Sequence, residues 1–84
     1  MNRILIKLYV PLLEKKYDIW IPINKSIYYC LNSFLNGIDA INKIQYVYGE
    51  NYPRLYNKET ADVYNVNSMV VDTDIRNGTE LILF

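Results

Sequence analysis

Few side chains in this sequence could support catalysis or bind a metal. There is no His and only one Cys, Cys30. The usual general base, the usual transition-metal ligand and any internal disulfide or four-Cys metal site are therefore missing. Asp72 and Asp74 are paired carboxylates of the kind that can hold a metal or exchange protons, but they adjoin a turn, where Asp is favoured for local hydrogen bonding. We expect a protein that is not an enzyme and that uses no cofactor and no metal.

Two other features point to packing or binding rather than to catalysis. Cys30 lies beside an apolar helical stripe with no basic neighbour nearby in sequence, which predicts a packed thiol and not a reactive one. Nine tyrosines are a possible stacking surface for bases, but nine basic and nine acidic residues give a net charge of zero. Zero net charge disfavours nucleic acid and anionic membrane surfaces as partners.

A single small domain must position these side chains. Eighty-four residues are enough for one domain over 1–84 with a thin core. Period-two alternation over 4–10 predicts a strand that Pro11 ends, and the alternation over 17–23 predicts a second strand. The second strand is expected at a sheet edge, because Pro22 is tolerated there.

An amphipathic helix is expected next. Asn24 or Ser26 is a suitable N-cap. Gly37 is expected to end or bend the helix, and the tyrosine-rich residues 43–52 to form a loop. The apolar residues that recur on one helical face are Ile27, Leu31, Phe34, Leu35, Ile38 and Ile41.

The second half of the chain reads as short strands separated by turns. Strands are predicted over 54–56 and 61–64, with a turn over 57–60, an irregular segment over 67–75 and a final strand over 79–84. The final strand is apolar throughout its end, which is typical of a central strand, so we place it beside the first strand and parallel to it. One helix on one face of a mixed sheet of about five strands, in the order ββαβββ, is an α+β fold of the β-grasp type.

Particular motifs in this half resemble a known family. Arg54-Leu55-Tyr56, then Ser68 and residues 74–83, resemble the second half of ubiquitin. The Asn-Gly turn and apolar strand over 75–84 are similar to the ending of small bacterial ubiquitin-like proteins of the YukD/EsaB type. The resemblance covers nearly the whole chain. It implies a ubiquitin-like fold and a role as a cytosolic accessory or regulatory factor of the type VII secretion machinery of Gram-positive bacteria.

One departure from ubiquitin bears on function. The sequence ends at Phe84 without a Gly-Gly pair, so we expect neither a covalent modifier nor a sulfur carrier. Lys7 interrupts the first apolar run, no cleavage site follows it, and no run approaches the ~18 apolar residues of a membrane span. The expected location is the cytoplasm, without direct membrane insertion.

The face of the sheet opposite the helix is the candidate binding surface. Strand alternation places five apolar residues on it, and we expect them to bind a protein partner, such as a component of the secretion machinery. The alternatives are that a second copy covers this face in a homodimer, or that the 43–52 loop covers it. A structural homo-oligomer, or an interaction module unrelated to secretion, is the alternative function. The five residues are Leu5, Trp20, Tyr56, Ile82 and Phe84.

Overall fold

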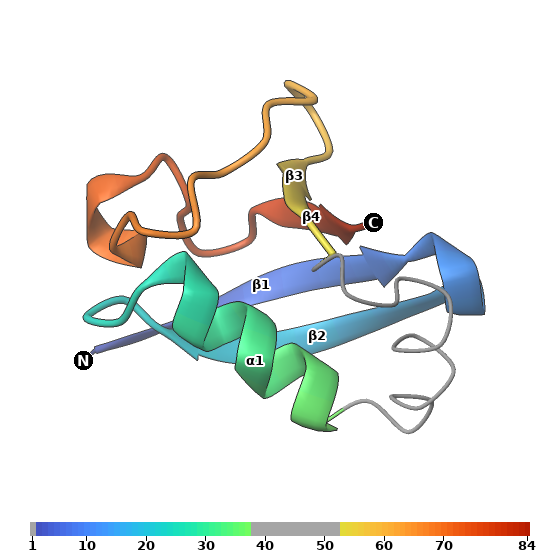
Figure 1. Ribbon diagram of the computed structural model, residues 1–84, viewed down its shortest axis with the longest axis horizontal. Coiled ribbons are helices and arrows are strands. Elements are labelled where there is room, and N and C mark those ends of the chain that lie inside the picture. Colours follow the sequence, from blue (N-terminus) through green and yellow to red (C-terminus); the bar gives the residue numbers. More distant parts are fainter. Residues whose placement is uncertain (1, 38–52) are drawn as a thin grey trace.

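The computed structural model describes residues 2–37 and 53–84, which form one sheet and one α-helix (Figure 1). Two short 3-10 helices, Pro11–Leu13 and Val70–Asp72, lie in connections. The regular elements are β1 (Arg3–Val10), β2 (Lys15–Pro22), α1 (Ile27–Gly37), β3 (Leu55–Asn57) and β4 (Glu80–Leu83).

The sheet has the strand order β2-β1-β4-β3. The first and last strands, β1 and β4, are parallel neighbours at its centre, and the other pairings are antiparallel. This arrangement confirms the placement expected from the apolar character of the two strands. It also confirms an α+β fold of the β-grasp type, with β2 and β3 at opposite edges of the described sheet.

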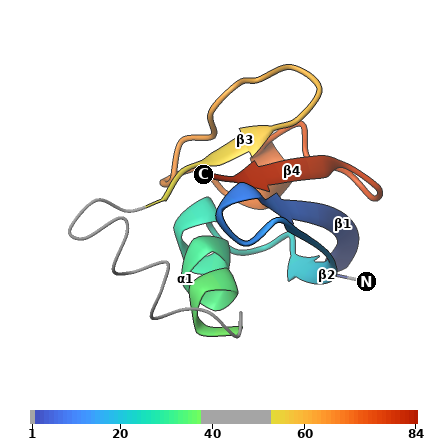
Figure 2. The same cartoon turned by 90° about the vertical axis from the view of Figure 1, so that its right-hand side faces the viewer.

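The helix begins where Ser26 caps it. The Ser26 Oγ accepts the backbone N–H of Tyr29 at 3.1 Å, which satisfies one of the free donors of the first turn. Ser26 is therefore the cap, and Asn24 is not. Figure 2 shows α1 lying along one face of the sheet. Ile38, Ile41 and the predicted 43–52 loop lie outside the described residues, and the structure describes the helix as far as Gly37.

The core lies between α1 and the facing side of the sheet. Alternate residues of the central strands, such as Ile6, Leu8 and Leu81, are fully buried there. The alternation predicted from sequence is confirmed, because the intervening residues are less buried or exposed. The helix contributes Ile27, Cys30, Leu31, Phe34 and Leu35 to the same core.

The predicted strand over 61–64 is wrong. Only Val63 forms a bridge there, opposite Tyr56. Ala61 has φ 63°, a left-handed conformation that an extended strand cannot contain. The described sheet therefore has four strands where about five were expected, and β3 begins at Leu55, one residue later than predicted.

Candidate functional site: the sheet face opposite the helix

All five predicted site residues lie on the sheet face opposite α1, which we call the outer face. Each alternates with a buried or core-packed neighbour in its own strand. Trp20 and Phe84 are 55% and 60% exposed, while Leu5, Tyr56 and Ile82 are partly exposed. More than half of the surface of each of these two residues, Trp20 and Phe84, is therefore exposed on this face.

The strand register divides these residues into two groups. Leu5 stands opposite Trp20, and Tyr56 stands opposite Ile82. Ile82 also stands opposite Tyr9, four residues along β1 from Leu5. At about 3.3 Å per residue, this offset separates the groups by roughly 13 Å along the strand. The five residues therefore share one face of the sheet but do not form one contiguous patch.

A row of charges separates the two groups. Lys7 stands opposite Asp18 on one side and Glu80 on the other. The Nζ of Lys58 lies 3.2 Å from the Oε2 of Glu80, with both side chains about half exposed. Charges of opposite sign thus alternate across the sheet, an arrangement that favours cross-strand pairs. Exposed pairs of this kind add about 0–1 kcal/mol to stability. The main consequence of the row is therefore that it separates the two apolar groups, and not that it stabilises the fold.

The larger group is an aromatic cluster that we define as Tyr9, Tyr56, Ile82 and Phe84. Ile82 lies between the two tyrosines in the register. Phe84 follows on the same face, and its backbone exchanges two hydrogen bonds of 2.9 Å with Arg54. The Nζ of Lys16 lies 6.0 Å from the Tyr9 ring centroid. Cations therefore stand at both sides of the cluster, Lys16 on β2 and Arg54 beside β3.

Tyr9 was missed in the sequence-based assignment of the site. It shares the outer face with Leu5, because both have odd numbers in the same strand. The odd residue number alone was therefore sufficient to place Tyr9 on the outer face. Its position opposite Ile82 was not predictable, because it depends on which β1 residues β4 pairs with.

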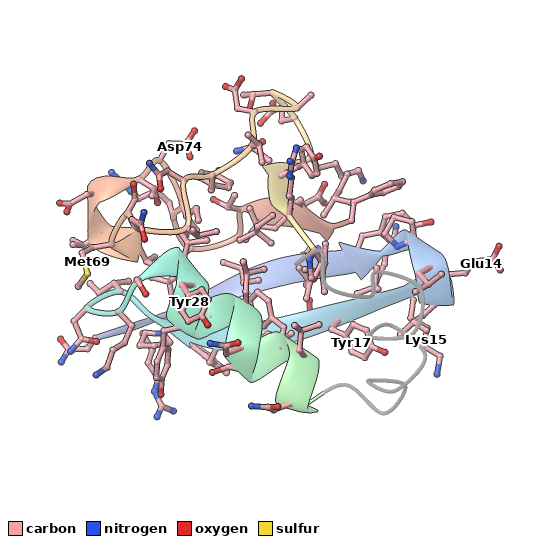
Figure 3. The ribbon with its side chains drawn as sticks, viewed as in Figure 1. Glu14, Lys15, Tyr17, Tyr28, Met69 and Asp74 are labelled. Atoms are coloured by element: carbon pink, nitrogen blue, oxygen red, sulfur yellow. The ribbon has the colours of Figure 1, made fainter. Side chains whose placement is uncertain are left out.

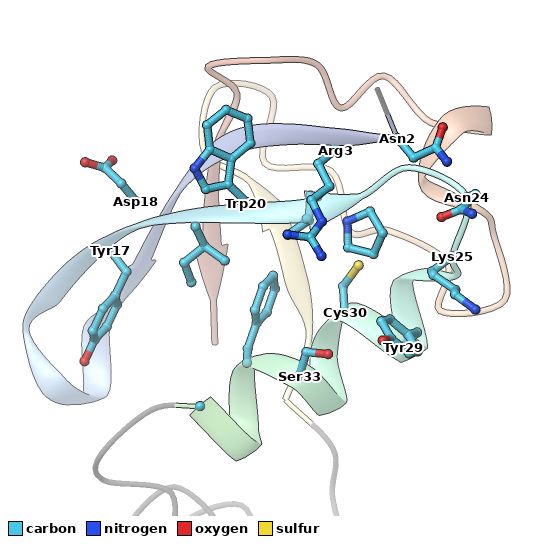
Figure 4. Close-up of a pocket in the computed structure, with 15 residues that line it drawn as sticks. Asn2, Arg3, Tyr17, Asp18, Trp20, Asn24, Lys25, Tyr29, Cys30 and Ser33 are labelled. Atoms are coloured by element: carbon cyan, nitrogen blue, oxygen red, sulfur yellow. The ribbon is translucent and has the colours of Figure 1, made fainter.

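The smaller group is held by the turn that precedes β4. The Oδ1 of Asn77 accepts the Leu5 N–H at 2.8 Å, and the Gly78 N–H donates to the Leu5 carbonyl at 2.7 Å. Gly78 has φ 88°, a conformation that favours glycine. The Trp20 side chain, in contrast, projects freely away from α1 (Figure 4).

The other candidates from the sequence have structural roles. Cys30 is buried, and burial raises the pKa of its thiol to about 11, so it is not a reactive thiolate near neutral pH. Asp74, labelled in Figure 3, accepts a 2.6 Å hydrogen bond from the Tyr64 hydroxyl. Burial and this contact raise the pKa of Tyr64 to about 12. Residues 2–37 and 53–84 contain no group of three or more metal-ligating side chains.

The hydroxyl of Tyr64 also accepts a 2.9 Å hydrogen bond from the side chain of Asn57, whose own oxygen accepts the backbone N–H groups of Glu59 and Thr60. This network fixes the turn after β3.

In the part of the chain that the structure describes, no helix has both the length and the apolar character needed to cross a membrane.

Comparison with known proteins supports the fold. No protein-family model and no curated protein matches the sequence. A solved ubiquitin-like domain, from Arabidopsis thaliana protein At2g32350, superposes with a TM-score of 0.64 at 13% identity, covering 100% of this chain and 78% of that one. A chain of an ESX-5 inner membrane complex gives 0.72 at 11% identity, covering 100% of this chain and 21% of that one.

A chain of a toluene 4-monooxygenase complex gives a TM-score of 0.63 at 6% identity, covering 98% of this chain and 99% of that one. Identities this low establish the fold alone. The chain therefore has a ubiquitin-like fold, as its motifs predicted.

Proposed function

We propose that this protein is a non-enzymatic, ubiquitin-like adaptor or regulator of a bacterial protein-secretion system of the type VII, ESX/Yuk-like class, related to the YukD/EsaB proteins and acting in the cytoplasm. It binds a protein component of that machinery through the outer face. The observation that carries the proposal is the aromatic cluster, because Phe84 is exposed, Tyr9 and Tyr56 are partly exposed, and adjacent aromatic side chains of this kind are typical binding hot spots.

The cluster also indicates the chemistry of the partner. Lys16 and Arg54 flank it, and both are exposed. An apolar patch with a cationic rim is complementary to an apolar patch with an acidic rim. We therefore expect the partner to place apolar side chains over Ile82 and carboxylates near the two cations.

One of the comparisons supports the secretion setting. A chain of an ESX-5 inner membrane complex contains a domain of this fold, and the motif resemblance implied the same class of machinery. A chain of a toluene 4-monooxygenase complex has the fold as well. An interaction module unrelated to secretion is therefore the second candidate, and both settings use the fold inside a larger assembly.

The test is direct binding between the purified chain and the cytoplasmic part of the ATPase of the secretion system from the same organism. Substituting Tyr56→Ser and Phe84→Ser in the aromatic cluster should weaken binding at least about tenfold, since truncated aromatic hot spots cost about 2 kcal/mol or more. Val71→Ser is the matched control, because Val71 is 53% exposed and lies in the 3-10 helix Val70–Asp72, outside the strands that form the outer face.

Equal binding by the cluster variants and the control would contradict the outer face as the binding site. A wild-type chain that sediments as a dimer and becomes a monomer with Phe84→Ser would show instead that the face binds a second copy.

A third variant, Trp20→Ser, measures how much the smaller group contributes to binding. We expect a lesser effect from it, because the charged row separates Trp20 from the cluster.

A further inference from the structure

The two edges of the sheet differ in how they are covered. At the β3 edge, Tyr64 donates its N–H to Leu55 and Asn57 donates its N–H to Asp62, each at 2.9 Å. At the other edge, β1 is the only strand that pairs with β2 among the described residues. An eight-residue strand with a free edge is long enough to pair with another extended segment.

The backbone groups at this edge follow from the register. The Ile23 N–H donates to the Asn2 carbonyl at 2.7 Å. In an antiparallel pair, hydrogen-bonded positions alternate with non-bonded ones. The backbone groups of Lys16, Asp18 and Trp20 therefore point away from β1 and toward the free edge. Leu5, opposite Trp20, accordingly bonds to the 77–78 turn and not to β2.

A groove of about 650 Å³ lies between this edge and α1 (Figure 4). Its walls are Tyr17 and Ile19 from β2 and Cys30 and Phe34 from the helix. In Figure 4, Tyr17 points from the strand toward the helix, and Cys30 points from the helix toward the strand. A segment added to β2 would place alternate side chains in this groove, over the partly exposed edge of the core.

The charges at the groove define its occupant. Lys15 and Lys16 lie at the hairpin end, beside Glu14, and Arg3 and Lys25 line the opposite end. Asp18 is the acidic residue in the wall of the groove. Cations thus exceed anions among the described residues here, and they stand at both ends. A second copy of the chain would bring the same positive excess, whereas acidic ends on an incoming segment would complement it.

We propose that the groove between β2 and α1 binds an extended segment of a protein partner, which joins the sheet as a strand beside β2, directs alternate apolar side chains toward α1 and carries acidic residues at both ends. This site is separate from the aromatic cluster and does not depend on the function proposed for that cluster. Lys15, Lys16 and Pro22 on β2 also disfavour aggregation through this edge. Protection from aggregation alone, however, would not require a groove beneath the strand.

The probe is the synthetic peptide Asp-Glu-Val-Thr-Val-Thr-Val-Asp-Glu, titrated into the isotopically labelled chain and followed by NMR. The amide signals of Lys16, Asp18 and Trp20 should shift, and those of Ile82 and Phe84 should not. Replacing the acidic ends of the peptide with lysines should abolish the shifts. Signals that move mainly at Ile82 and Phe84 would overturn the proposal.

N-methylated versions of the peptide test strand addition itself. One peptide carries the methyl groups on its threonine amides and the other on its valine amides. One of them should lose roughly tenfold in affinity, because its donors face β2, while the other keeps its affinity, because its methyl groups face solvent. A loss of affinity for the peptide methylated on its threonine amides would indicate that the added strand is antiparallel to β2. Equal affinity for both peptides would overturn strand addition.

A pair of variants gives the same test from the protein side. Asp18→Pro removes both the charge and the edge N–H, whereas Asp18→Asn removes the charge alone. Pro is tolerated at an edge position whose N–H faces away from the ladder. The Pro variant should bind roughly tenfold more weakly than the Asn variant. If Asp18→Pro does not fold, the methylated peptides decide the question. Self-association of the free chain that the same change abolishes would show that the occupant is a second copy and overturn the proposal.

Discussion

Truncating Leu81 should remove a large part of the stability of the fold. Leu81 is 0% exposed and lies in β4 between Leu8 of β1 and Asn57 of β3. Leu→Ala at such a position leaves a cavity and costs about 3–5 kcal/mol. A domain of 84 residues is expected to be stable by about 4–13 kcal/mol. Leu81→Ala should therefore cost from about a quarter of that stability to nearly all of it.

The next residue supplies the control. Ile82 is partly exposed on the outer face, so Ile82→Ala should cost about 1 kcal/mol. Urea unfolding followed by far-UV circular dichroism measures both, and unchanged m-values would show that the midpoints report stability. Equal losses, or a larger loss at Ile82, would refute the assignment of faces on which the fold and both proposed surfaces depend.

Two further predictions concern α1. Ser26→Ala should lower the free energy of unfolding by about 1 kcal/mol, because it removes the side chain that accepts the Tyr29 N–H. The control Ser33→Ala, at an exposed position inside the helix, should change the free energy of unfolding little. Equal effects of the two variants in urea unfolding would argue against the cap. Burial raises the pKa of the Cys30 thiol from 9.0 to about 11, so this thiol stabilises the fold fully below pH 9 and progressively less as the pH rises to 11. The stability difference between the wild type and Cys30→Ala should shrink over that interval, and a constant difference would contradict the shift.

Sequence patterns were sufficient for most of the fold because most of it follows local rules. Period-two alternation predicted β1 and β2, and Pro11 marked where β1 ends. The apolar run in β4 predicted its central position beside β1. These signals depend on which face of an element is buried, and burial leaves a direct trace in residue type.

The details of the outer face were less accessible because they depend on register. Alternation correctly placed Trp20 and Ile82 on the same face. It contained no information on how far apart they lie, because β4 pairs with residues 7–9 of β1 and its register is set by contacts distant in sequence, such as that of Asn77 with Leu5. The charged row and the role of Tyr9 follow from this register.

The failure of the predicted strand over 61–64 explains why the two edges differ. The left-handed residue Ala61 prevents a regular strand, yet the segment still satisfies backbone groups of β3 through Asp62 and Tyr64. An irregular segment of this kind covers an edge without creating a new one. Among the described residues, the backbone groups of β2 have no such cover, and the groove lies beneath that strand. A strand added there would extend the sheet on the side of Lys16, so the edge and the outer face would form one wider surface. The two parts of that surface would recognise their partners differently, through main-chain hydrogen bonds at β2 and through aromatic side chains around Ile82.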